Sequence, residues 1–130
     1  MNYALRIDLE RPFDEVLAMT KESLAASGFG VLTEIDLKKT LKDKIDVDVD
    51  DQVIIGACNP RFAHQALQVE PSLGLLLPCN VVVRHSAGVT VVEAIDPETM
   101  VTLTGNDKMA PLADEVRSAL RTALDRVATA

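Results

Sequence analysis

Residues 79–95 read CNVVVRHSAGVTVVEAI and decide the fold of this chain. Two valine-rich runs flank the small residues Ser86-Ala87-Gly88, and branched side chains such as valine pack well on a pleated strand. A short turn between two such runs is a signal of a β-hairpin. We therefore expect an antiparallel pair, with one strand over residues 79–85 and the next over residues 89–95, where Asp96-Pro97 ends it.

Patterns of apolar residues predict three more strands. The first is a half-buried strand near the N-terminus, because every second residue is apolar: Tyr3, Leu5, Ile7 and Leu9. A second strand is expected over residues 29–37, with one face made by Phe29, Val31, Thr33 and Ile35. The continuous apolar run at residues 53–57 predicts a buried strand over residues 52–57.

Proline and glycine mark where the helices begin and end. Pro12 opens a first helix, which ends at about residue 27, before Gly28. Asn59 is then the N-cap and Pro60 the first residue of a second helix, which ends before residue 71. The inward face of this second helix is expected to hold Phe62, Ala63, Ala66 and Leu67.

The segment 37–51 is ambiguous, because Leu37, Leu41 and Ile45 fit a helix while alternate residues after Ile45 also fit a strand. We expect a short helix followed by a loop. Its aspartates suggest calcium, since calcium loops place oxygen ligands at alternate positions: Asp46, Asp48, Asp50 and Asp51. The segment lacks the glycine and the distal glutamate of such a loop, so we interpret it as a solvated acidic turn.

A helix over about residues 111–127 completes the order strand, helix, strand, connection, strand, helix, strand, strand, helix. This order fits an α+β fold, in which helices pack mainly on one face of a single mixed or antiparallel sheet. The chain has 130 residues, which is the usual size of one domain. We therefore expect residues 1–130 to form a single domain.

Charge and composition disfavour several kinds of partner. The formal net charge of −7 argues against nucleic acid and anionic membrane surfaces, because both are bound through Lys and Arg. No apolar stretch approaches the roughly 20 residues that a bilayer span needs, and no export signal opens the sequence. The two cysteines are too few for a disulfide framework. A reduced, cytoplasmic protein that binds neither nucleic acid nor membrane is the expectation.

Both cysteines lie beside an asparagine and a proline at predicted strand boundaries. The two segments are Gly56-Ala57-Cys58-Asn59-Pro60 and Leu77-Pro78-Cys79-Asn80. Regular strand pairing stops at a proline, which leaves backbone groups available for binding. The candidate ligand-binding residues are therefore Cys58, Asn59, Pro60, His64, Pro78, Cys79 and Asn80.

The chemistry of these residues has three interpretations. Cys58 precedes a helix N-terminus, where the dipole favours a thiolate, so Cys58 and Cys79 could form a reversible disulfide. With His64 they could instead bind zinc and leave one position open. The third interpretation is structural, with the cysteines packed as small apolar residues. The Cys-x-x-Cys spacing that is specific for metal and redox sites is absent, and the sequence identifies no cofactor.

The chain resembles the domain of unknown function 302 family, a set of small bacterial and archaeal proteins. The resemblance rests on segments that span nearly the whole chain in the family's order: Gly28-Phe29-Gly30-Val31, residues 56–60 with Ala63-His64 and Leu67, residues 74–80 followed by Val81-Val82-Val83, and Asp96-Pro97. It implies a compact α+β fold and often a homodimer. It implies no agreed activity.

Two hypotheses for the function follow. The first is a small domain that forms a homodimer and binds a small ligand or partner near the strand ends at Cys58 and Cys79. The second is a thiol-dependent or zinc-assisted enzyme, in which Cys58 is the nucleophile or a ligand, Cys79 the resolving partner or second ligand, and His64 the base or third ligand. The sequence contains no phosphate loop, dinucleotide fingerprint or serine-hydrolase elbow, so it yields no reaction and no substrate.

Overall fold

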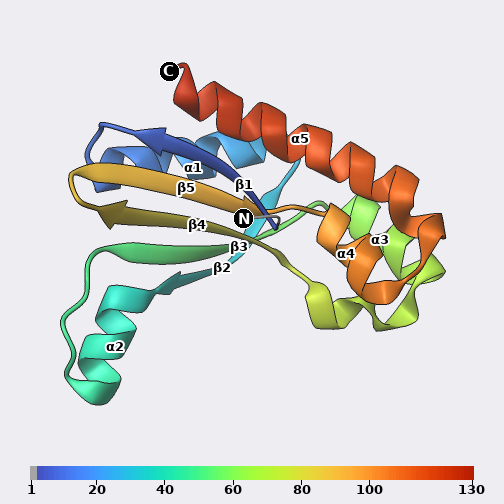
Figure 1. Ribbon diagram of the computed structural model, residues 1–130, viewed down its shortest axis with the longest axis horizontal. Helices are drawn as coiled ribbons and strands as arrows, with labels where there is room; N and C mark the ends of the chain where they lie inside the picture. Colours follow the sequence, from blue (N-terminus) through green and yellow to red (C-terminus); the bar gives the residue numbers. More distant parts are fainter. Residues whose placement is uncertain (1–2) are drawn as a thin grey trace.

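The structure, a computed structural model, describes residues 3–130 (Figure 1). Within that range the chain forms one antiparallel sheet with the strand order β1-β5-β4-β3-β2. The strands are β1 (Ala4–Leu9), β2 (Gly30–Asp36), β3 (Gln52–Cys58), β4 (Cys79–Ser86) and β5 (Val89–Ile95). The helices are α1 (Phe13–Ala26), α2 (Leu37–Ile45), α3 (Pro60–Val69), α4 (Glu98–Thr104) and α5 (Ala110–Ala128), with short 3-10 helices η1 (Pro71–Leu76) and η2 (Asp107–Met109). The predicted α+β class is confirmed.

The hairpin of β4 and β5 lies at the centre of the sheet. Ser86 pairs with Val89, so the turn between the strands has two central residues, Ala87 and Gly88. Both have positive φ, 50° and 80°. Positive φ at both central residues is typical of the type I′ turn, whose twist matches that of the two strands it connects. The predicted antiparallel pair is confirmed.

The two faces of the sheet have different surroundings. One face is covered by α1 and α5, which pack side by side (Figure 1). Side chains that alternate toward these helices form the main core, among them Leu5, Ile55, Val81, Val83 and Val92, each no more than 1% exposed. On the opposite face, which we call the uncovered face, no helix of residues 3–130 packs over the centre (Figure 1).

Strand β2 contradicts the predicted alternation. Val31 pairs with Ala57 and Thr33 pairs with Gly56, and the register shifts between them, which leaves Leu32 as the extra residue of a bulge. A bulge reverses the alternation, so Val31 and Thr33 belong to opposite faces of the sheet. The single face predicted for Phe29, Val31, Thr33 and Ile35 is therefore wrong. Tyr3, predicted as part of the inward face of the first strand, is 59% exposed and precedes β1.

Residues 37–51 form a projecting arm, which consists of α2 and the loop that follows it (Figure 1). The predicted helix followed by a loop is confirmed. Asp36 caps α2, because its side chain accepts a hydrogen bond from the Lys39 N–H at 3.0 Å. None of the nine residues of α2 is buried. Asp46, Asp48 and Asp50 of the loop are exposed, as the acidic turn predicts.

At the other end of the sheet α3, η1, α4 and η2 pack together into what we call the lobe. Asn59 caps α3 as predicted, since its Oδ1 accepts the Phe62 N–H at 3.3 Å. Helix α4 was not predicted. Leu67, expected to face inward, is 37% exposed, whereas Ala66 is buried. Among residues 3–130 we find no helix that is long and apolar enough to cross a membrane.

Candidate functional site

The candidate site lies where β3 ends and β4 begins. Ala57 pairs directly with Cys79 across these two strands, which places the two predicted cysteine segments side by side. Asn59 then ends the strand region and caps α3. On its other side Asn59 approaches Gly28, where an added Cβ would lie 3.2 Å from Asn59 Nδ2. Since Gly28 also has a φ of +88°, only glycine fits this position without strain.

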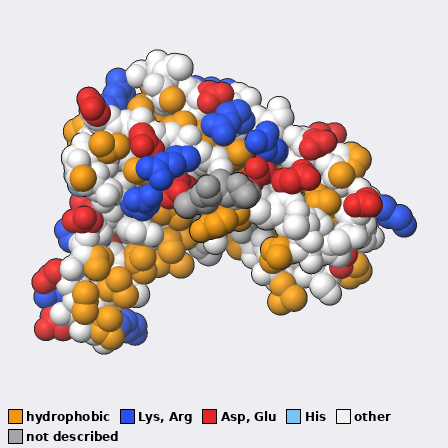
Figure 2. All heavy atoms as spheres, viewed as in Figure 1, with side chains coloured by type: hydrophobic (Ala, Val, Ile, Leu, Met, Phe, Trp, Pro, Cys, Tyr) orange, Lys and Arg blue, Asp and Glu red, His pale blue; other side chains and the backbone are white. Residues whose placement is uncertain are grey.

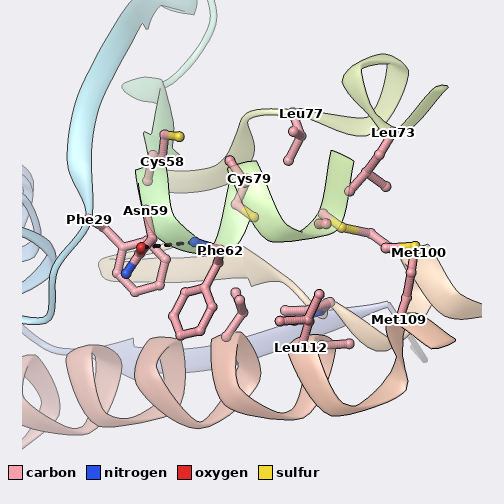
Figure 3. A pocket seen from close by; sticks show the side chains of 16 residues that line it. Phe29, Cys58, Asn59, Phe62, Leu73, Leu77, Cys79, Met100, Met109 and Leu112 are labelled. Atoms are coloured by element: carbon pink, nitrogen blue, oxygen red, sulfur yellow. Dashed lines mark hydrogen bonds between the residues drawn. The ribbon is translucent and has the colours of Figure 1, made fainter. Parts of the chain in front are cut away.

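A cavity of about 40 Å³ opens beside these residues, between the sheet end, the lobe and α5 (Figure 3). Its lining is almost wholly apolar and includes Phe29, Phe62, Leu73, Cys79, Met100 and Met109. Among the described residues that line it there is no carboxylate, imidazole, ammonium or guanidinium group. A volume of this size exceeds that of one water molecule, but a water needs several polar partners, so the cavity favours an apolar occupant.

Cys79 presents its thiol to this cavity (Figure 3). Cys79 as a whole is 7% exposed. It belongs to the same buried cluster as Ala66, Leu73, Met100 and Met109. Burial raises the pKa of the Cys79 thiol to about 11, with a smaller contribution from the nearby Cys58. The thiol is therefore protonated near neutral pH, where it behaves as a small apolar group and a poor nucleophile.

Cys58 differs from Cys79 although both border the cavity. Because Cys79 pairs with Ala57, the next residue along β3 directs its side chain to the opposite face of the sheet. Figure 3 shows the Cys58 sulfur pointing away from the cavity and the Cys79 sulfur pointing into it. Both thiols are free. A disulfide requires side chains that point toward each other, so this arrangement does not favour one without backbone movement.

The other predicted site residues divide into two groups. Pro60 and His64 lie on exposed positions of α3 and do not line the cavity. Pro78 and Asn80 line a separate open groove of about 300 Å³, which continues toward the uncovered face. Within the part of the chain that the structure describes, no three His, Cys, Asp or Glu side chains gather as a metal site would require. The structure thus brings together Cys58, Asn59 and Cys79, but not His64.

Several lining residues were not among the predicted site residues. Met100 lies on α4 and Met109 on η2, and both are nearly fully buried. Phe29 follows the left-handed Gly28, a signal that marks a chain reversal but not a cavity. Met100 and Met109 join the site through the packing of the lobe against α5, which no local sequence pattern indicates.

Comparisons with known proteins place the chain among relatives. The profile of a family described as "Domain of unknown function DUF302" matches residues 5–127. The crystal structure of an uncharacterized conserved protein DUF302 from Bacillus stearothermophilus superposes with a TM-score of 0.91 at 27% sequence identity, covering 98% of this chain and 99% of that one. No curated protein matches this chain. The family match spans nearly the whole sequence and the fold agrees, and the chain therefore belongs to the domain of unknown function DUF302 family.

Proposed function

We propose that the protein is a homodimer in which each protomer binds a small ligand through an apolar group that enters the cavity beside Cys79. The observation that carries the proposal is the lining of this cavity, which is almost wholly apolar and in which Cys58 and Asn59 are half-buried. Ligand pockets are typically mostly apolar, with few polar groups that fix orientation. Two free thiols fit a reducing compartment such as the cytoplasm.

The size of the cavity restricts the apolar group. A volume of about 40 Å³ accepts a few carbon atoms, such as a short alkyl chain. Met100 and Met109 both line the cavity (Figure 3), and methionine adapts its shape more easily than branched side chains. Rotation of these two side chains would admit a longer chain.

A polar group of the ligand would remain at the rim. Asn59 is half-buried there, and its Oδ1 already accepts the Phe62 N–H. The Oδ1 atom keeps a second lone pair, which can accept a hydrogen bond from a ligand hydroxyl. A short aliphatic molecule with a hydroxyl end therefore matches the site.

A thiol-dependent or zinc-assisted enzyme has less support. The raised pKa of Cys79, its expected resolving partner or second ligand, keeps that thiol protonated, and the exposed His64, its expected base or third ligand, lies outside the cavity lining. No observation favours the enzyme over the binding domain.

The experiment is a titration with straight-chain 1-alkanols from propanol to octanol, followed by NMR of protein labelled with 13C in the methionine methyl groups. We expect the Met100 and Met109 signals to shift and saturate, while the Met19 signal on α1 stays in place. Each added methylene should tighten the Kd about fourfold, because burying one methylene stabilises by about 0.8 kcal/mol. The gain should stop when the cavity is full.

The matched variants are Ala66→Val, which adds two carbons inside the cavity, and Ala25→Val on the exposed surface of α1. Ala66→Val should weaken alkanol binding at least tenfold, and Ala25→Val should leave it unchanged. Equal shifts of Met19, Met100 and Met109 without saturation would show that alkanols contact the surface unspecifically, and would overturn the proposal.

A further inference from the structure

No residue of the arm, residues 37–51, is buried. Helix α2 has nine residues, none of them buried, and its main contacts are with β2 and β3. An isolated helix of this length is marginal in water, because its few hydrogen bonds barely offset the cost of starting it. Ile45 and Val47 at the end of the arm are 63% and 41% exposed. The arm therefore presents apolar groups that the rest of residues 3–130 leaves partly exposed.

A hollow lies between the arm and the lobe. Figure 2 shows the molecule hollowed between the projecting arm and the lobe, with hydrophobic side chains gathered along the roof of the hollow. The roof is the uncovered face, whose apolar residues include Ile35, Ile54, Val82 and Ile95. The far wall is the lobe, where the groove is bordered by Leu75 and Leu103, 88% and 71% exposed.

The charges on the uncovered face are balanced although the chain carries −7. The charged side chains that alternate onto this face are two arginines and two acids, Arg6, Arg84, Asp8 and Glu93. They form ion pairs within the chain: Arg6 Nε lies 2.8 Å from Asp8 Oδ1, and Arg84 Nε lies 3.0 Å from Glu93 Oε1. A surface with equal numbers of both signs can face a copy of itself, because each arginine can meet an acid of the other copy. A partner with one sign of charge, such as a polyanion, would not be attracted to this balanced surface.

We infer that the arm, the uncovered face and the lobe form the contact between two copies of this chain, with the arm of each copy lying in the hollow of the other. This inference rests on the proposed homodimer and names its surface. In a twofold dimer, the commonest symmetry of soluble dimers, both copies use the same surface, so a surface with a projection and a hollow can place each projection in the hollow of the other copy. The contact covers Ile45 and Val47 of one copy with the lobe and the uncovered face of the other.

The test places a lysine at each part of this surface. Ile35→Lys lies on the uncovered face, Ile45→Lys on the arm and Leu103→Lys on the lobe, and all three positions are exposed in the single chain. A buried charge should raise the dimer Kd by roughly thirtyfold or more, measured by sedimentation equilibrium. Added lysine lowers the net negative charge, so general repulsion between copies cannot cause the weakening.

The control is Ala25→Lys, an exposed position on α1 over the opposite face of the sheet, which should leave the dimer Kd unchanged. Thermal unfolding of each variant followed by circular dichroism confirms that the fold is intact. Wild-type protein that is monomeric at every concentration would overturn the homodimer and the contact together. A dimer that persists in all three variants would overturn the contact alone, and a loss confined to one variant would contradict a contact that spans arm, face and lobe.

Discussion

The two faces of the sheet use similar residues for different purposes. On the covered face, branched side chains such as Ile55 pack under α1 and α5 with no exposed surface. On the uncovered face, Ile35 of the edge strand β2 is 45% exposed, and Ile54 and Val82 of the inner strands are half-buried. An antiparallel sheet that faces water on one side normally carries polar residues there, so apolar residues on an uncovered face need another explanation. The comparison shows that helices cover the apolar residues of one face, whereas some apolar residues of the other face remain in contact with water.

The largest expected effect on stability comes from replacing isoleucine by alanine, once on each face of the sheet. Ile55→Ala should lower the free energy of unfolding by about 2 to 5 kcal/mol, because it leaves a hole in a packed core. Ile35→Ala should cost the monomer less than about 1 kcal/mol, because its side chain already contacts water. Urea unfolding at a concentration below the dimer Kd measures both. Equal losses would refute the distinction between the faces.

The two cysteines give a second comparison, through pH. The folded Cys79 thiol has a pKa of about 11, above its ordinary value, so the unfolded chain releases this proton first as pH rises. Stability is then constant below about pH 9 and falls by about 2 to 3 kcal/mol between pH 9 and 11. Urea unfolding across this range should show the loss in wild type and in Cys58→Ala, and a smaller loss in Cys79→Ala. Identical pH profiles of stability in all three proteins would show that the Cys79 thiol does not cause the loss.

Glycine substitutions define how far the open part of the uncovered face extends. An added Cβ at Gly56 would collide with the Thr33 side chain and would lie 2.8 Å from Pro78 Cγ, so Gly56→Ala should destabilise by about 1 to 3 kcal/mol. Gly74 in η1 has open space around it, and Gly74→Ala should be neutral. Thermal unfolding of the two variants tests the contrast. A neutral Gly56→Ala would show that the sheet is open at this end as well.

The smallest expected effect compares the caps of two helices. Asn59→Ala removes the cap of α3, which packs in the lobe, and should destabilise the protein by about 1 kcal/mol. Asp36→Ala removes the equivalent cap of α2 but should change global unfolding less, because the arm has no buried residue. Chemical denaturation gives the global change, and amide exchange within α2 gives the local one. A larger global loss for Asp36→Ala would show that the arm belongs to the core.

Sequence patterns predicted most of the fold, and the failures have physical reasons. The hairpin, the capped start of α3 and the helix of the arm follow from local signals at Gly88, Asn59 and Leu41. The bulge at Leu32 depends on pairing with β3, which local alternation does not reveal. Helix α4 contains several β-branched residues, which favour strands, yet its threonine hydroxyls bond to backbone carbonyls of the preceding turn.

The candidate site was predicted only at its rim. Cys58, Asn59 and Cys79 were candidates because each lies beside a proline at a predicted strand boundary, and they border one cavity. His64 lies two positions before Ala66, roughly 200° away around α3, and so points out of the site that Ala66 lines. The opposite directions of the two thiols follow from the pairing of Ala57 with Cys79, a register that depends on the whole sheet.

The most direct test of the account is amide hydrogen exchange at two protein concentrations, one far below and one far above the dimer Kd. If a second copy completes the uncovered face, exchange in β2 and α2, residues 30–45, should slow at the higher concentration, while exchange in α1 on the covered face stays the same. Exchange that is independent of concentration in β2 and α2, in protein that sediments as a dimer, would contradict the account and place the contact elsewhere.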